Sequence, residues 1–343
     1  MFKRVLPALT LCFLSAPVWA QAVADTPAPS ATAAQELEEA EAVPQVVLVT
    51  GSRPGPGLWR VSKGEHVLWV FGTYAPLPKN IEWRSRHVEK IIANSQEYLK
   101  PPTAHIGVGW MGGIGALPFL IGAKKNPDGA ELKDVLPPDL YARWQPVKQK
   151  YFGSDADIER ERPSCVAGQL FGRAMTQAGL AGGSDIYKTI EKIVEKHNIK
   201  VTDARYSIQI KEPGKALREF KKSPMADAAC LAKTIASLDT DVDVMRARAN
   251  AWAVGELDEI RKLDFDDRSN TCFEALTNSS IAKNQPEMRT IKVQAAAKWV
   301  AAAEKALASN ASTFTAVQIK DILDPKGVIA TLQGRGYTIE APK

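Results

Sequence analysis

The sequence is poor in the side chains that carry most enzyme chemistry. It contains four histidines and four cysteines among 343 residues, and aromatic residues make up only 7% of the chain. No two cysteines have the Cys-x-x-Cys spacing of a zinc site, and neither an HExxH nor a GxSxG motif is present. These absences exclude the common zinc-protease and serine-nucleophile motifs.

Positive charge is not concentrated in any one segment. The chain has 44 basic and 39 acidic residues. Without Lys3 and Arg4, which lie in an N-terminal segment expected to be removed, 42 basic residues remain and the net charge is +3. No block of Lys and Arg with interleaved aromatic residues occurs. Nucleic acid is therefore not an expected partner.

The chain also lacks an apolar run with the features of a membrane anchor. Lys3 and Arg4 precede an apolar stretch at 5–18, which two prolines interrupt and which is shorter than the about 20 residues that a membrane helix needs. The stretch leads into Val-Trp-Ala, which predicts a secretory signal peptide at 1–20, cleaved after Ala20. We expect a periplasmic or secreted protein without stable membrane insertion.

The residues after the leader divide into a spacer and a domain. Residues 21–45 are rich in Ala, Pro, Thr and Glu and contain no aromatic residue, which predicts a disordered linker. The remaining 46–343 suit a single large domain. Within it, the Gly-rich apolar segment 109–122 is expected to form a buried loop and a short helix.

Three cysteines remain in the mature chain, and the expected compartment is oxidising. Cys230 and Cys272 fall on expected helices that a short connection can fold back to back, so we expect them to form a disulfide. Cys165 is then expected to be a buried core thiol, the usual fate of a lone cysteine.

The segment 58–78, LWRVSKGEHVLWVFGTYAPLP, organises the rest of the chain. Apolar runs at 58–61 and 67–71 flank Lys63-Gly64-Glu65, which predicts a β-hairpin. Its second strand leads into the loop GTYAPLP, and sites commonly lie on loops at strand ends. This loop nevertheless contains no metal ligand and no strong acid or base.

The periodicity of the following residues predicts elements of both kinds. In the first part of the domain we expect a helix at 78–93, a strand at 97–100 and an extended piece at 105–108. A mostly helical region at 137–308, with one strand at 204–210, is expected to follow. The last part is expected to form a strand at 313–319, a loop at 318–323, a helix at 324–333 and a strand from 336 to 339. The expected helices of the middle region are 138–150, 154–181, 184–198, 213–222, 225–263, 270–283 and 286–308.

One expected helix carries an unusual polar and aromatic set, from MRARANAWAVGEL. Its members are Arg246, Arg248, Asn250 and Trp252. Because alternate residues do not share one helical face, part of this set is expected to point inward and to cap the sheet or line a cleft. An Arg packed against Trp within a helical layer is the alternative that we prefer to ligand binding.

Two segments together resemble the TraB/GumN family, which is related to the Tiki-type metal-dependent peptidases. They are the segment 58–78, followed by a helix and EYLKPP, and the C-terminal segment TFTAVQIKDILDPKGVIATLQGRGYTIEAP. The resemblance covers residues 58–342. It implies an α+β fold whose mixed sheet is built from both ends of the chain around a mostly helical middle.

The resemblance also implies a divalent metal held by a histidine in each of two GxxH loops and by a glutamate after the first helix. This chain departs from the pattern at each position. Gly72, Thr73 and Tyr74 match the first loop, but Ala75 stands where the histidine belongs. In the second loop Gln318 lies near the glycine position and Asp321 near the histidine position. The glutamate position falls near Lys100 or Pro101, and Glu97 is the nearest carboxylate.

We therefore expect a catalytically degenerate member of the family, with no bound metal or cofactor. Its expected role is that of a periplasmic binding or structural module for a protein or peptide. The alternative is a metal-dependent peptidase or hydrolase with non-standard ligands, in which His105 acts with Glu97 or Asp321. That alternative requires these side chains to meet within about 5 Å in one cleft. The other histidines, His66, His87 and His197, are expected to be solvated.

Overall fold

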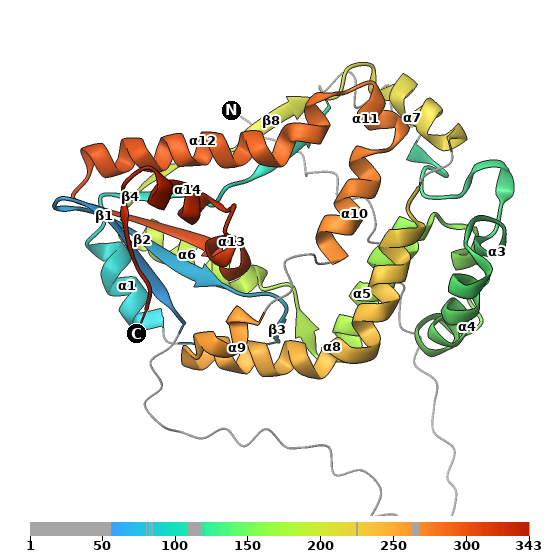
Figure 1. Cartoon of the computed structure of the whole chain (residues 1–343), viewed down its shortest axis with the longest axis horizontal. Helices are drawn as coiled ribbons and strands as arrows, with labels where there is room; N and C mark the ends of the chain where they lie inside the picture. Colours follow the sequence, from blue (N-terminus) through green and yellow to red (C-terminus); the bar gives the residue numbers. More distant parts are fainter. Residues whose placement is uncertain are drawn as a thin grey trace, which may run out of the picture. The chain divides into compact units, whose positions relative to one another are not determined.

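A mixed six-stranded sheet runs through the part of the chain that the computed structural model describes (Figure 1). Its strand order is β10-β1-β2-β9-β4-β7, with bounds Thr338–Glu340, Leu58–Lys63, His66–Thr73, Ser312–Gln318, Glu97–Leu99 and Lys200–Thr202. Both ends of the domain thus contribute to one sheet, and the region between them is mostly helical. The α+β class expected from the sequence is confirmed.

The described residues are 56–342, apart from 80, 82, 84, 109–117, 119, 224–225 and 263–267. The expected signal peptide at 1–20, the expected linker at 21–45 and most of the Gly-rich segment 109–122 lie outside them. Within the described ranges, no helix has the length and apolar character needed to cross a membrane.

The N-terminal hairpin forms as expected. β1 and β2 are antiparallel, and Leu58 pairs with Phe71 while Lys63 pairs with His66. Only Gly64 and Glu65 separate the strands, and Gly64 adopts a positive φ of 60°, which a tight hairpin turn requires. This turn fixes the register and so brings the loop after Thr73 to the far end of β2.

The strands β2, β9, β4 and β7 run parallel to one another. Their carboxyl ends therefore share one edge of the sheet. In open sheets of parallel strands, this is the edge at which ligands usually bind. The hairpin partner β1 and the last strand β10 complete the sheet in antiparallel fashion on the other side of β2.

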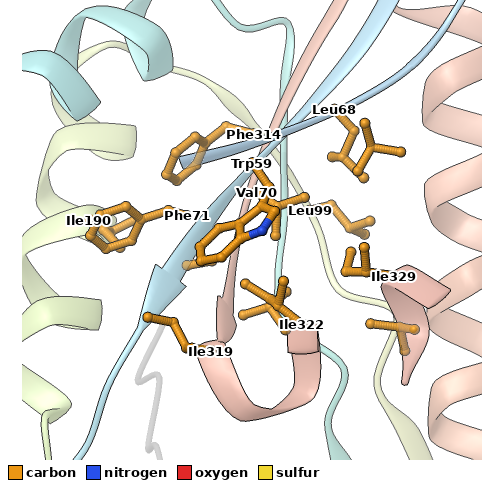
Figure 2. Packing of buried hydrophobic residues seen from close by; sticks show 14 of the residues in the cluster. Trp59, Leu68, Val70, Phe71, Leu99, Ile190, Phe314, Ile319, Ile322 and Ile329 are labelled. Atoms are coloured by element: carbon orange, nitrogen blue, oxygen red, sulfur yellow. The ribbon is translucent and has the colours of Figure 1, made fainter. Parts of the chain in front are cut away.

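Helices cover both faces of the sheet (Figure 1). α1 (Ser85–Ala93) and α6 (Ser184–Lys196) lie on the face that carries Phe71 and Phe314, whereas α12 (Glu287–Ser309) and α14 (Val328–Gly334) lie on the other. Figure 2 shows Ile190 of α6 beside Phe71, and Ile329 of α14 on the opposite side. Burial of these apolar side chains is the main stabilising contribution to such a layered fold.

The middle of the chain builds a second group of packed helices. They are α3 (Leu132–Val135), α4 (Pro138–Phe152), α5 (Pro163–Gln177), α7 (Pro213–Lys222), α8 (Ala228–Val254), α9 (Leu257–Arg261), α10 (Arg268–Thr277) and α11 (Ser280–Lys283). Trp144, Val166 and Leu231 are fully buried in a core of their own. Two small sheets join this region to the rest: β3 (Leu77–Pro78) with β6 (Leu180–Ala181), and β5 (Ala104–Gly107) with β8 (Tyr206–Gln209).

Several expected boundaries are wrong. The helix expected at 78–93 begins at Ser85, because Leu77–Pro78 pairs with β6 instead. The middle region contains β6 and β7 in addition to the one expected strand. The loop expected at 318–323 is a short helix, α13 (Ile319–Leu323), and the next helix begins only at Val328.

Two long expected helices are also divided. The segment 154–181 contains a 3-10 turn, η2 (Asp157–Arg160), the separate helix α5 and the strand β6. The segment 225–263 breaks at Gly255, whose φ of 79° ends α8 before α9 begins. A positive φ is costly for other residues, so glycine ends the helix here.

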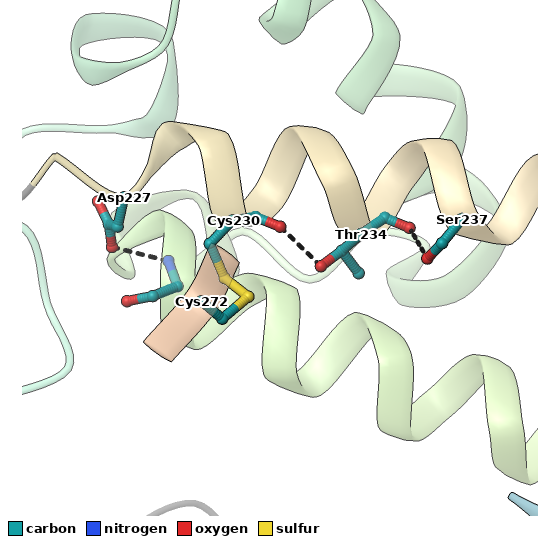
Figure 3. Close-up of a disulfide and its surroundings, with 6 residues drawn as sticks. Asp227, Cys230, Thr234, Ser237 and Cys272 are labelled. Carbon is teal, nitrogen blue, oxygen red and sulfur yellow. Dashed lines mark hydrogen bonds between the residues drawn. A yellow bond between two sulfur atoms is a disulfide. The ribbon is translucent and has the colours of Figure 1, made fainter. Parts of the chain in front are cut away.

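The expected disulfide between Cys230 and Cys272 is present and joins α8 to α10 (Figure 3). Next to it, the Asp227 carboxylate accepts a 2.8 Å hydrogen bond from the Ser164 amide, which ties the start of α8 to α5. Cys165 was expected to be buried, but it is only half-buried.

Candidate functional site

The two loops of the family pattern lie side by side at the carboxyl edge of the sheet. Gly72 pairs with Val317, and Thr73 pairs with Gln318, at the ends of the neighbouring parallel strands β2 and β9. The first loop, Gly72–Ala75, therefore leaves the sheet next to α13, which carries Asp321. Segments from opposite ends of the domain meet here.

Gly72 is held in a space that admits no side chain. A Cβ atom at this position would lie 2.5 Å from the Trp59 ring and 2.6 Å from Ile319. Its carbonyl oxygen accepts a 2.7 Å hydrogen bond from Nε1 of Trp252, which is fully buried. The Trp252 ring also packs against two aromatic rings, with centroid distances of 6.2 Å to Phe71 and 6.3 Å to Trp83, and these contacts fix the indole. The loop thus begins from a rigid, closely packed position.

The hydroxyl groups of Thr73 and Tyr187 lie 2.9 Å apart at the same edge. Burial raises the pKa of Tyr187; the hydrogen bond with Thr73 opposes this, and the nearby negative charge of Asp321 adds to it. Tyr187 therefore stays protonated at neutral pH. This pair supplies hydrogen-bonding groups but no base.

Tyr74 and Ala75 differ in exposure. Tyr74 is buried, whereas Ala75 is exposed and is followed by a cis bond to Pro76. Gly183, at the start of α6, packs against this turn, and a Cβ atom there would lie 3.0 Å from the Tyr74 carbonyl oxygen. The position at which the family pattern has a histidine thus presents a methyl group.

Glu97 lies at the opposite edge of the sheet. It pairs with Thr313 at the start of β9, and its carboxylate accepts hydrogen bonds from Lys200 at 3.0 Å and Asn310 at 2.9 Å. Burial raises the pKa of Glu97, but hydrogen bonds from Thr202, Asn310 and Lys200 outweigh burial and leave the pKa lowered. This carboxylate stabilises the start of two strands and does not reach the loops.

His105 is not brought to the loops either. It is exposed on β5, where it pairs with Ser207 of β8 outside the six-stranded sheet. Of the other histidines, His66 bonds the Asn310 carbonyl oxygen at 2.8 Å, His197 contacts Glu89 at 3.3 Å, and His87 is exposed. Glu97, His105 and Asp321 therefore form no shared centre.

The residues at the loops do not fit the divalent metal that the family resemblance implies. Such an ion needs several oxygen, nitrogen or sulfur ligands around one point. Asp321 is the carboxylate of the second loop, and the first loop contributes none. Across the described ranges, no group of three or more His, Cys, Asp or Glu side chains suits a metal ion.

A cavity of about 340 Å³ lies beside the two loops, and we refer to it as the loop cavity. Its walls include Thr73–Pro76 of the first loop and Gln318–Lys320 of the second. Four of its described lining residues are cationic: Lys233, Arg248, Arg268 and Lys320. No Asp or Glu is among the described lining residues. The site thus has a basic lining where the resemblance implies a metal centre.

The members of the polar and aromatic set on α8 point to different places. Trp252 points inward and donates to Gly72, and Arg248 lines the loop cavity. Arg246 pairs with Asp243 and donates to the Ala178 carbonyl oxygen at 2.9 Å, outside the cavity lining. The expectation that part of this set points inward is therefore correct.

Sequence reasoning missed Lys233, Arg268 and Lys320. A signal existed for α8, where Lys233, Ser237, Met245 and Arg248 are spaced to lie along one helical face. That spacing alone does not say which element the face meets. The cations of α10 and α13 have no local pattern, because tertiary packing brings them to the cavity.

The model of the TraB/PrgY/gumN family matches residues 57–341, most of the chain. No curated protein and no solved structure matched the chain.

Proposed function

Because the chain belongs to the TraB/PrgY/gumN family, we propose that it keeps the family fold as a binding module without metal-dependent catalysis. The module acts after export, in the periplasm or outside the cell. Its partner is a protein or peptide that occupies the loop cavity.

The observation that carries this proposal is the chemistry of the two adjacent loops. The first presents the methyl group of Ala75, and the second contributes one carboxylate, that of Asp321. Four cations line the same cavity. Cations close to a metal position repel the ion, so this lining disfavours a metal and favours a negatively charged ligand.

The alternative, a hydrolase with non-standard ligands, has less support. It requires Glu97, His105 and Asp321 to act together. Glu97 is paired at the opposite edge of the sheet, and His105 is exposed on a separate small sheet. General acid–base catalysis needs the acting groups within hydrogen-bond reach of one substrate.

Metal analysis combined with a hydrolysis assay tests the loss of catalysis. The mature protein, purified and incubated with Mn²⁺, Co²⁺ or Zn²⁺, is expected to retain no stoichiometric metal and to cleave no peptide. Asp321→Asn serves as the matched variant, because it removes the one loop carboxylate and keeps its size. Stoichiometric metal with peptide cleavage, both lost in Asp321→Asn, would contradict the proposal.

Export is tested separately by fractionation of cells that express the full chain. The mature N-terminus is expected at residue 21 in the periplasmic or extracellular fraction. A chain without residues 1–20 is the control and is expected to remain in the cytoplasm. Recovery of the uncleaved chain in the cytoplasm would contradict the proposed location.

A further inference from the structure

We infer that a groove between α6 and the edge strand β7 binds a basic peptide segment, which adds beside β7 and inserts a lysine side chain. We refer to this space as the edge groove. Its volume is about 540 Å³, and residues of α6 form one wall while residues of β4 and β7 form the other. It shares no described lining residue with the loop cavity, so the inference adds a second site to the proposed function.

The hydroxyl group of Tyr98 is the first observation that points to a ligand. Tyr98 lines the edge groove and is only 1% exposed, and its hydroxyl makes no hydrogen bond with a described residue. The oxygen is not among the fully enclosed atoms without a partner, so the small exposed part of this side chain is its polar end. Burial raises the pKa of Tyr98, and the negative charge of Glu191 adds to this rise, so the phenol stays protonated. Buried polar groups normally have a partner, which a ligand in the groove would supply.

Two carboxylates of α6 line the same groove. Glu191 and Glu195 are one helical turn apart, and like charges at this spacing repel each other. Lys100 pairs with Glu191 at 3.2 Å, whereas Glu195 forms no ion pair with any residue that the structure describes. The groove therefore retains the negative charge of Glu195. A cation bound beside it would relieve the repulsion and would suit the site better than an anion.

Apolar side chains separate these polar groups and favour a lysine. Val194 is buried on α6, and Ile199 and Val201 add apolar surface from the residues that follow this helix. The four-carbon stem of a lysine packs against such surface, while its ammonium group donates up to three hydrogen bonds. The Tyr98 oxygen and the Glu195 carboxylate are acceptors for these bonds. A hydrated inorganic cation gains nothing from the apolar walls.

The open edge of the sheet provides a place for the peptide backbone. β7 is the last strand on its side of the sheet, next to β4. The Lys100 amide donates a 2.9 Å hydrogen bond to the Thr202 carbonyl oxygen, so the backbone groups of Thr202 face β4. Because successive residues of a strand alternate in direction, the N–H and C=O groups of Val201 face the open edge. Val201 is 47% exposed, so an added strand has access to these groups.

Pairing with β7 determines which peptide side chains enter the groove. Tyr98 and Val201 are opposite each other in the parallel register, so their side chains share the face that α6 covers. Glu97 and Lys200 form a 3.0 Å ion pair on the other face. Alternate residues of an added strand lie on the α6 face. We therefore expect lysine at alternate positions of the peptide. Because β7 has only three residues, contacts in the groove must supply most of the affinity.

Fluorescence anisotropy with a labelled peptide, Thr-Lys-Thr-Lys-Thr, tests the inference on the mature protein. We expect saturable binding, and at least about fivefold weaker binding of the same peptide with Gln in place of Lys. Tyr98→Phe keeps the ring and removes the hydroxyl, and it is expected to weaken binding at least about threefold. Glu195→Gln is expected to weaken binding about two- to fivefold, because the carboxylate is exposed. Tyr141→Phe on α4 and Glu65→Gln in the hairpin turn are the matched controls and are expected to bind like the wild type.

Val201→Pro tests backbone pairing, because it removes the N–H group that faces the open edge and breaks no bond to β4. It is expected to weaken peptide binding about three- to tenfold, whereas Val201→Thr, which keeps the N–H group, changes it less than about twofold. Circular dichroism and thermal melting establish that each variant is folded. If Val201→Pro does not fold, a peptide that is N-methylated at every backbone nitrogen replaces it, with the same expected weakening on the wild type.

Equal binding of the Lys and Gln peptides would overturn the inference, as would unchanged binding by folded Tyr98→Phe or Glu195→Gln. Equally tight binding of Nα-acetyl-lysine methylamide would show that a free amine suffices and would overturn the assignment of a peptide. Unchanged binding by folded Val201→Pro, or of the N-methylated peptide, would overturn the pairing with β7. None of these results bears on the proposed loss of catalysis, which metal binding and hydrolysis test separately.

Discussion

The indole Nε1 of Trp252 donates a 2.7 Å hydrogen bond to the carbonyl oxygen of Gly72. This bond ties the end of α8 to Gly72, the first residue of the loop that leaves the sheet at the end of β2. The same helix supplies Lys233 and Arg248 to the loop cavity. One helix thus positions the loop and contributes to the charge beside it.

Replacement of Trp252 by Phe removes this bond and leaves a buried carbonyl group without its donor. The free energy of unfolding is expected to fall by about 1–3 kcal/mol, measured by urea denaturation. Trp69→Phe is the control, because Trp69 is only half-buried and makes no side-chain hydrogen bond within the described ranges. Equal losses in both variants would argue against a specific role for the bond.

Gly72→Ala tests the close approach of the strand to its neighbours. The added Cβ would meet Trp59 and Ile319 well inside contact distance, so the free energy of unfolding is expected to fall by about 1–3 kcal/mol. Gly168→Ala on α5 is the matched control, since a Cβ atom added there would meet no described atom within 4 Å beyond its chain neighbours and the backbone of its own helix. There the change is expected to stabilise the protein by about 0.5–1 kcal/mol, through helix propensity.

The pH dependence of stability distinguishes a structural Glu97 from a catalytic one. The folded-state pKa of Glu97 lies below its ordinary value of 4.5, so the ionised carboxylate stabilises the folded state above that pH. This contribution is lost as pH falls from 4.5 through the lower folded-state pKa. Glu97→Gln is expected to be less stable than the wild type at neutral pH, with the difference shrinking as the solution becomes acidic.

Urea denaturation at several pH values measures this difference. Glu65→Gln, an exposed change in the hairpin turn, controls for the loss of one negative charge. A stability difference between wild type and Glu97→Gln that stays constant as the pH falls from neutral to well below 4.5 would contradict the assigned role of the carboxylate.

Removal of the disulfide tests the link between α8 and α10. The bond closes a loop with a sequence separation of 42 residues, and the Cys230→Ser, Cys272→Ser double variant is expected to lose about 2–4 kcal/mol of unfolding free energy. Cys165→Ser is the control, and it is expected to change stability by less than about 1 kcal/mol. Alkylation without reductant is expected to label Cys165 alone; labelling of all three thiols would contradict the pairing.

Strong local patterns made much of the fold predictable. The apolar runs on either side of Lys63-Gly64-Glu65 predict the hairpin, and helical spacing identified α4, α6, α7 and α12. The short strands β6 and β7 were missed because two or three residues have no measurable period; pairing with a distant partner creates them. α13 was missed for the same reason, since it has only five residues.

The candidate site was predictable only in its loops. Family resemblance led to Gly72–Ala75 and Gln318–Asp321, and these two segments are neighbours in the sheet. It did not lead to Lys233, Arg268 or Lys320, because each lies on a different helix and the sequence does not encode their meeting in any short segment. His105 and Glu97 were chosen for their chemistry, and strand pairing keeps them apart.

The disulfide also affects the spacing of the charges in the cavity. Cys230 lies three residues before Lys233 on α8, and Cys272 lies four residues after Arg268 on α10. The bond therefore fixes the two helices close to the points at which each contributes a cation. In a reducing compartment the same chain would hold both cations without this covalent restraint. Reduction of this bond would therefore release the covalent restraint between two walls of the loop cavity, the one at Lys233 and the one at Arg268.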